Sequence, residues 1–159
     1  MKPATIHEIK QELGTLPASA LMELCLRLAK FKKENKELLT YLLFEASDEA
    51  AFIAAVKKEM DLEFDELPKS NHYLTKKTLR KILRGTARQI RYMGSAQAEV
   101  ELLTHFCLMV RRRRIPLESS AVMNNLYRQQ MKKIRAAIAT MHEDLQYDYL
   151  RDLNGLDGK

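Results

Sequence analysis

The sequence predicts a single all-α domain of six or seven helices. Its 159 residues include only five glycines and four prolines, whereas an all-β sandwich needs turn residues roughly every 8 to 12 positions. Apolar residues make up 46% of the chain, enough to form a core without disulfides or a structural metal. They recur in steps of three and four, the spacing that places side chains on one face of a helix.

The first 45 residues are expected to form two helices and a buried segment. The first helix spans residues 5–13, and Gly14 suits its C-terminal cap. The second runs from Pro17 to about Lys33. Its apolar stripe consists of Leu21, Leu24, Cys25, Leu28 and Phe31. After a polar stretch at 32–36, residues 38–44 are apolar on almost every side, so we expect them to be buried.

The next helix is expected to begin at Ser47 as its N-cap, with Asp48 and Glu49 in its first turn, where the helix dipole favours negative charge. Pro68 ends this half of the chain. The apolar stripe of the helix comprises Phe52, Ala55, Val56 and Met60. These side chains are predicted to belong to the core.

The second half is expected to contain three longer helices. The first continues to Gly94, and its N-cap is one of Ser70, Asn71 and Thr75. Ser95 caps the following helix, which ends near Pro116, so the two form an αα-hairpin. A long helix then runs from about Ser119 to Leu153. Residues 1–153 thus form the predicted domain, and residues 154–159 form a frayed tail.

One short segment of the sequence occurs twice, and this repetition bears on the architecture. Residues 37–44 and 101–108 share the tetrapeptide Glu-Leu-Leu-Thr at an offset of 64 residues, each time in the second arm of an expected hairpin. A repeated hairpin would give a short α-solenoid that resembles HEAT and armadillo repeats in architecture. Leu and Glu are common in all helices, so an irregular helical bundle is the other interpretation.

Charge is distributed unevenly along the chain. Residues 1–67 form an acidic half with nine Lys and Arg against thirteen Asp and Glu. Residues 68–135 form a basic half with sixteen against three, and residues 136–159 form an acidic end with two against five. The net charge of +6 therefore understates one strongly cationic block between two acidic flanks.

The helix before Gly94 carries six cations of this block on one face. At 100° per residue, its cations fall within an arc of about 100°; they are Lys77, Arg80, Lys81, Arg84, Arg88 and Arg91. A solvated helix face usually mixes Glu with Lys, but residues 73–98 contain no acidic residue. Because these cations repel one another, the row indicates an anionic partner. Tyr73 and Tyr92 are candidate stacking surfaces beside it.

The hairpin is expected to extend the row with four arginines. Antiparallel packing would return Arg111, Arg112, Arg113 and Arg114 to the neighbourhood of Lys76 and Lys77, and residues of the following helix, Arg128, Lys132 and Arg135, would widen the surface. The predicted function is a binding or adaptor module that contacts nucleic-acid backbone, DNA or RNA, without sequence specificity. The alternative is a scaffold for an acidic protein surface, and a solvated face without a dedicated ligand is the third interpretation.

A heptad-like seam suggests self-association. Apolar residues follow each other in steps of four and three along the last helix; they are Tyr127, Met131, Ile134, Ile138, Met141 and Leu145. Two copies would form a homodimer through this seam. The other interpretation is packing of the same helix within its own domain.

No motif for catalysis, a cofactor or a metal is found in the sequence, so a non-enzymatic protein is expected. His7-Glu8 and His142-Glu143 lack the second histidine of a zinc-protease helix, and Glu101 with His105 lacks di-iron spacing. The acidic residues at 61, 63, 65 and 66 suit a solvated helix end or charge neutralisation in a dimer. Cys25 and Cys107 occupy apolar helix positions and predict reduced core thiols in a cytoplasmic protein. No apolar run suits a membrane span or a signal peptide.

Overall fold

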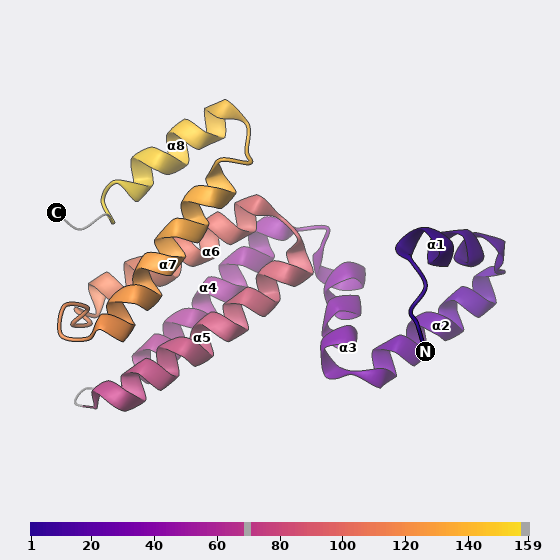
Figure 1. Cartoon of the computed structure of the whole chain (residues 1–159), viewed down its shortest axis with the longest axis horizontal. Coiled ribbons are helices and arrows are strands. Elements are labelled where there is room, and N and C mark those ends of the chain that lie inside the picture. Colours follow the sequence, from indigo (N-terminus) through magenta and orange to yellow (C-terminus); the bar gives the residue numbers. More distant parts are fainter. Residues whose placement is uncertain (69–70, 157–159) are drawn as a thin grey trace. The chain divides into compact units, whose positions relative to one another are not determined.

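The computed structural model describes residues 1–68 and 71–156, and over these residues the chain is helical, without strands (Figure 1). The all-α prediction is confirmed, although eight α-helices form over the described residues where six or seven were expected. Their bounds are α1 Ile6–Thr15, α2 Ala18–Phe31, α3 Lys33–Thr40, α4 Glu49–Asp65, α5 His72–Met93, α6 Ala96–Arg112, α7 Ala121–Ile138 and α8 Glu143–Leu153, with a π-helical turn at Tyr41–Glu45.

The expected long C-terminal helix divides into α7 and α8. The backbone N–H groups of Thr140 and Met141 donate to carbonyls three residues back, which tightens the chain into a turn. Nδ1 of His142 then accepts from the backbone N–H of Asp144 and caps α8. Glu143 and Asp144 fill the first turn of α8, where negative charge is favoured. These residues start a new helix.

Contacts divide the chain into two units, residues 1–45 and residues 46–159, where one domain over 1–153 was expected. In the first unit, Thr5 and Glu8 form a capping box at the start of α1. Helix α3 packs against α2, and Asn35 Nδ2 donates to the Leu28 carbonyl over 2.9 Å. None of the residues in α1, α2 and α3 is buried.

The expectation that residues 38–44 are buried is wrong for most of the segment. Tyr41 is buried, but Leu42, Leu43 and Phe44 are 55%, 64% and 72% exposed. These residues lie in or next to the π-helical turn at Tyr41–Glu45, in which Tyr41 is the buried residue. Cys25, expected in the core, is also exposed.

In the second unit, α6 is the central helix and packs against α4, α5 and α7. Phe106 on α6 is fully buried, and its ring centroid lies 5.5 Å from that of Phe64 on α4. Leu79 on α5 and Ile134 on α7 are buried in the same cluster. Helices α5 and α7 both pack against α6, the central helix of this unit (Figure 1).

The helix caps follow from short polar side chains. Asn71 caps α5 and Ser95 caps α6, as two of the cap predictions state. Ser70, another candidate for the α5 cap, lies outside the described residues. Asp48 caps α4 in place of Ser47, and Ser120 caps α7, one residue after the expected start.

The two copies of the repeated segment, residues 37–44 and 101–108, differ in their burial. Residues 37–44 lie in α3 and the π-helical turn and are mostly exposed, whereas Leu102, Leu103, Phe106 and Cys107 of the second copy are buried in α6. A solenoid repeat would bury equivalent positions in equivalent ways. The repeat therefore stays a prediction that burial does not favour.

The end of the described chain is packed against the second unit. Leu153 and Leu156 are buried, and the hydroxyl of Tyr127 donates to the Leu156 carbonyl over 2.9 Å. The expected frayed tail therefore does not include residues 154–156, and residues 157–159 lie outside the described part. Among the described helices, none is long and apolar enough to cross a membrane.

Candidate anion-binding groove

An open groove of about 1040 Å³ lies in the second unit, bounded by side chains of α5, α6 and α7. We call it the α5–α7 groove. Its lining comprises Tyr73, Lys76, Lys77, Arg80, Leu83, Arg84, Ala87, Ile90, Arg91, Glu99, Leu103, Val122, Asn125, Leu126, Gln129, Gln130 and Lys133. Six of these side chains are cationic and one, Glu99, is acidic, so the groove has a strongly positive lining.

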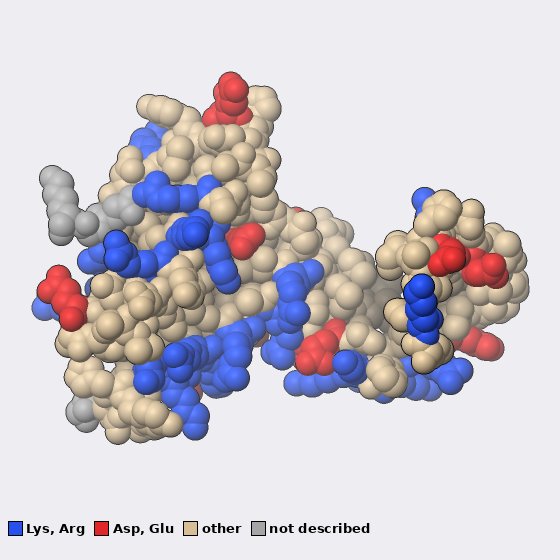
Figure 2. Space-filling model, viewed as in Figure 1, with Lys and Arg blue, Asp and Glu red and all other residues tan. Residues whose placement is uncertain are grey.

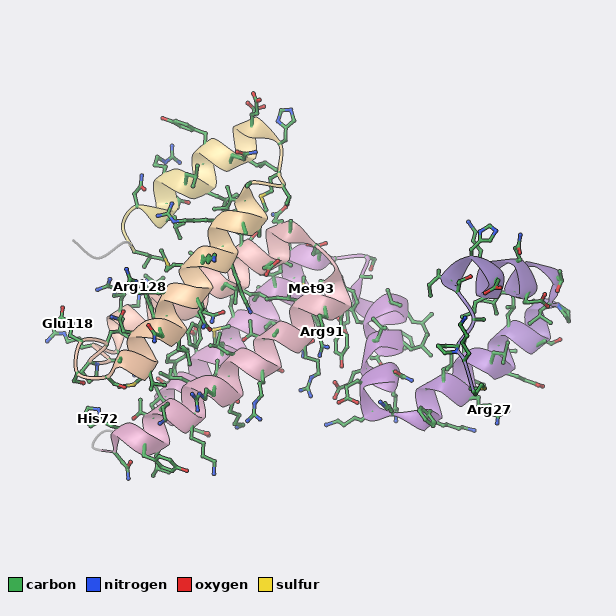
Figure 3. All side chains as sticks on the ribbon, in the orientation of Figure 1. Arg27, His72, Arg91, Met93, Glu118 and Arg128 are labelled. Carbon is green, nitrogen blue, oxygen red and sulfur yellow. The ribbon has the colours of Figure 1, made fainter. Side chains whose placement is uncertain are left out.

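The α5 wall supplies five of the six cations: Lys76, Lys77, Arg80, Arg84 and Arg91. Four of them are exposed, and Lys76 is half-buried. Helix α5 has no acidic residue of its own, so no partner within the helix neutralises this wall. Blue side chains accordingly gather over α5, and others lie over α7, with mostly uncharged surface between them (Figure 2). Arg91 lies at the end of α5, near Met93 (Figure 3).

The structure separates two members of the predicted cation row from the groove. Lys81 is 3.1 Å from Glu63 of α4, and Arg88 lines a smaller hollow of about 360 Å³ with Glu59 and Glu63. Relative to Lys77, both residues lie at the edge of the arc that faces α4, while Arg80, Arg84 and Arg91 lie toward the other edge. Because α5 lies between α4 and the groove, some cations of its arc face α4 and the others line the groove.

The acidic residues at the end of α4 find partners within the same chain. Oδ1 of Asp61 and Nε2 of His105 lie 2.6 Å apart, and Asp65 forms an ion pair with Arg113. Together with the Glu63–Lys81 pair, these contacts tie α4 to α5 and α6. The charge neutralisation considered for a dimer thus occurs inside one chain.

The arginine run at the end of α6 lies outside the α5–α7 groove. Arg111 donates to the Tyr127 hydroxyl and the Leu156 carbonyl, each over 3.3 Å, and its guanidinium lies 5.2 Å from the Tyr127 ring centroid. Arg112, Arg113 and Arg114 line a separate hollow of about 540 Å³, which residues Asn71, His72 and Thr75 also line. The expected single track along α5 and residues 111–114 is therefore not one continuous groove.

Of the two tyrosines predicted as stacking surfaces, one lines the groove and the other does not. Tyr73 lines the groove at the start of α5 and is 67% exposed as a residue, and Lys76 Nζ lies 5.6 Å from its ring centroid. Tyr92 is half-buried and is not part of the groove lining. Among the described residues, Tyr73 is the one aromatic residue that lines the groove.

The opposite wall and the floor were missed by sequence reasoning. Helix α7 contributes three amide side chains and one cation, Asn125, Gln129, Gln130 and Lys133, and the floor includes Leu83, Leu103 and Leu126. Nothing in the sequence of α7 marks this face, because its position opposite α5 depends on how both helices pack on α6. Arg128 and Lys132 are exposed but do not line the groove; Arg128 is labelled in Figure 3.

The heptad-like seam lies mostly inside the second unit. Tyr127, Met131, Ile134 and Ile138 are buried in its core, Met141 is half-buried, and Leu145 is exposed on α8. The break between α7 and α8 also removes the continuous helix that a coiled-coil seam requires. The spacing therefore reflects packing within the chain, and the four buried side chains offer no apolar surface to a second copy.

A polar cluster outside the groove joins α4, α6 and α8 through Glu101. Its carboxylate accepts from Lys57 Nζ (2.7 Å), Gln97 Nε2 (3.1 Å) and the Tyr149 hydroxyl (3.5 Å). Burial opposes ionisation of Glu101, but the hydrogen bonds from Lys57 and Gln97 outweigh it and lower the pKa. Burial also raises the pKa of the Cys107 thiol to about 12. Within the described residues, no group of three or more His, Cys, Asp or Glu side chains is arranged to hold a metal ion.

Comparisons of the chain with known protein families, with curated proteins and with solved structures find no match.

Proposed function

We propose that the protein is a non-enzymatic binding module whose α5–α7 groove contacts the sugar–phosphate backbone of nucleic acid without sequence specificity. The observation that carries this proposal is the α5 wall, where five cations line one side of a groove that contains a single carboxylate. Evenly repeated phosphates neutralise such a row along its length, which an isolated small anion cannot do. The proposal places the protein in the cytoplasm.

Fluorescence anisotropy of labelled single-stranded DNA, duplex DNA and RNA tests the proposal. Micromolar or tighter binding is expected at about 50 mM salt, falling steeply by about 300 mM as counterions are released. The variant Arg80→Glu with Arg84→Glu should weaken binding at least tenfold. It should also lower the slope of log affinity against log salt by about 2, since two phosphate contacts are lost.

A matched control separates the groove from the overall charge. Arg128→Glu with Lys132→Glu changes the net charge by the same amount on exposed positions of α7 that do not line the groove. This control should lose much less affinity. Equal losses in the two variants would contradict a groove-specific contact, and no binding to any polymer at low salt would refute the proposal.

An acidic protein segment is the second candidate partner. The apolar floor, with Leu83, Leu103 and Leu126, favours it because an amphipathic helix could place leucines there and carboxylates against α5. Binding of a glutamate-rich amphipathic peptide, with no binding of nucleic acid, would support this candidate. The same Arg80→Glu and Arg84→Glu variant would then weaken the peptide complex.

A further inference from the structure

The two long walls of the α5–α7 groove have different chemistry. The α5 wall is cationic, whereas the α7 wall presents the exposed amides of Asn125 and Gln129 with the single cation Lys133; Gln130 also lines this wall but is buried. Amides donate and accept hydrogen bonds at once, which matches base edges better than phosphates. The side chain of Gln130 is held by donation from its Nε2 to the Leu126 carbonyl over 3.1 Å.

The floor between these walls is apolar. Leu83 of α5, Leu103 of α6 and Leu126 of α7 contribute to it. A nucleic-acid duplex keeps its bases paired inside and would present only its backbone to such a groove, leaving the floor and the amides without a role. A single strand has base faces to set against apolar side chains and base edges to set against amides.

Tyr73 adds a stacking surface at one end of the groove. The residue is 67% exposed and lines the groove together with the cations of α5. From Tyr73 to Arg91 the α5 wall is about 27 Å long at 1.5 Å per residue. Aromatic rings beside a cationic track are the usual means of binding single strands with little sequence preference.

We infer that the α5–α7 groove takes single-stranded nucleic acid, with its phosphates along α5 and its bases turned toward the floor and the α7 amides. This inference rests on the proposed function and names its substrate class. Cations, apolar floor and amides occur in this order across the groove, which is the order of backbone, base face and base edge in a splayed strand.

The first test compares labelled oligo(dT) and oligo(U), each of about twelve nucleotides, with a duplex of the same length. Both single strands should bind at least tenfold more tightly than the duplex at equal salt, and the difference between them reports whether DNA or RNA is preferred. Duplex binding that equals or exceeds that of both strands would overturn this inference and leave the proposed function intact.

The second test uses variants that remove base contacts and keep the charge. Asn125→Ala with Gln129→Ala should weaken oligo(dT) binding several-fold with an unchanged salt slope, because no phosphate contact is lost. Arg80→Glu with Arg84→Glu should lower the slope as well. An amide variant that binds oligo(dT) like the parent protein would contradict the proposed orientation of the strand.

Tyr73 provides an independent readout with a matched control. Tyr73→Ala should weaken oligo(dT) binding about fivefold or more, whereas Tyr73→Phe should retain it because the ring is kept. Tyr147, which is 71% exposed on α8, does not line the groove, so Tyr147→Ala should have no effect. Equal behaviour of Tyr73→Ala and Tyr147→Ala would contradict stacking. Failure of all nucleic acids to bind would instead refute the proposed function itself.

Discussion

Glu101 is the residue through which three helices of the second unit meet. It lies on α6 and accepts hydrogen bonds from Lys57 on α4 and Tyr149 on α8. Its lowered pKa means that folding favours the ionised carboxylate. The stability that this group contributes is therefore present above the ordinary carboxyl pKa of 4.5 and is lost as the pH falls through the lowered value.

Glu101→Gln should accordingly show a pH-dependent loss of stability. At pH 7 we expect the free energy of unfolding to fall by about 1 kcal/mol, because the charged partner of Lys57 is removed from a half-buried site. At a pH well below 4.5, where more of the parent carboxylate is protonated, the difference should shrink. Urea unfolding followed by circular dichroism at both pH values measures this effect.

Lys57→Met is the companion variant for this prediction. It removes the donor at 2.7 Å from the other side, so its destabilisation should follow the same pH trend. A loss of stability that is equal at both pH values in Glu101→Gln would show that the ionised form of Glu101 is not favoured by folding.

At the scale of residues, the sequence predicted which side chains are cationic better than it predicted which residues they contact. The cation row is present on α5, and four of its six members line the groove, but Lys81 and Arg88 face α4. Arg111 was expected to contact a ligand and instead bonds to Tyr127 and Leu156, the latter 45 residues away. Such pairings depend on the fold of the whole unit, which local spacing does not encode.

Helix α5 ends in a way that fixes its link to α6. Gly94 adopts a left-handed conformation with φ 61° and donates its N–H to the Ile90 carbonyl over 2.9 Å. Ser95 then caps α6, so two residues connect the helices. Glycine suits this position because other residues are strained at positive φ.

Two identical substitutions in this region should have opposite effects. Gly94→Ala should lower the free energy of unfolding by about 1 kcal/mol, because alanine is strained in the left-handed conformation. Gly85→Ala lies within α5 itself, where an added Cβ has no heavy atom within 4 Å, and should raise it by about 0.5 to 1 kcal/mol. Chemical denaturation of both variants measures the two signs.

A common sign in the two variants would contradict this interpretation. If both destabilise, then the space around Gly85 is needed for packing against α4; if neither does, the link at Gly94 is not held in the left-handed conformation. Binding to oligo(dT) should be retained in Gly85→Ala, because its position lies in the hollow next to α4 and not in the α5–α7 groove.

At the scale of elements, caps and apolar periodicity were the informative signals. Ser95 and Asn71, the latter one of three candidates for its cap, mark helix starts in the sequence and in the structure, and α1 begins near Thr5 as expected. The break between α7 and α8 was missed because the apolar spacing continues across it from Ile138 to Leu145. His142 with two following acidic residues was the available signal for a new helix start.

The two units of the molecule differ in how much they bury. Apart from Tyr41, every buried residue of the described chain belongs to residues 46–159. Isolated helices as short as α1, α2 and α3 are marginal in water. Cooperative unfolding should therefore arise almost entirely from the second unit.

Deletion of residues 1–45 tests this division. We expect residues 46–159 to unfold cooperatively with a midpoint and a urea m-value close to those of the full chain, because the deleted part buries little surface. They should also keep the oligo(dT) affinity, since every groove residue lies beyond position 45. Loss of cooperative unfolding in the shortened chain would show that the second unit depends on residues 1–45.

For the whole molecule, composition was sufficient to predict the all-α class but not its division into units. The apolar run at 38–44 was expected to be buried, yet Leu42, Leu43 and Phe44 are exposed. The groove itself was beyond prediction, because it depends on how α5 and α7 each pack against α6. Sequence spacing describes one helix at a time and leaves the orientation between helices undetermined.

The uniform charge of α5 has a consequence for its motions. Cations four residues apart, such as Arg80 with Arg84 and Arg84 with Arg88, repel each other across each turn. Local openings of α5 would relieve this repulsion, so we expect its backbone amides to exchange with solvent deuterium more readily in the free protein than packing alone would require. A bound polyanion reverses this, since it stabilises only the closed helix. Binding of a polyanion in the groove is therefore expected to make α5 more rigid.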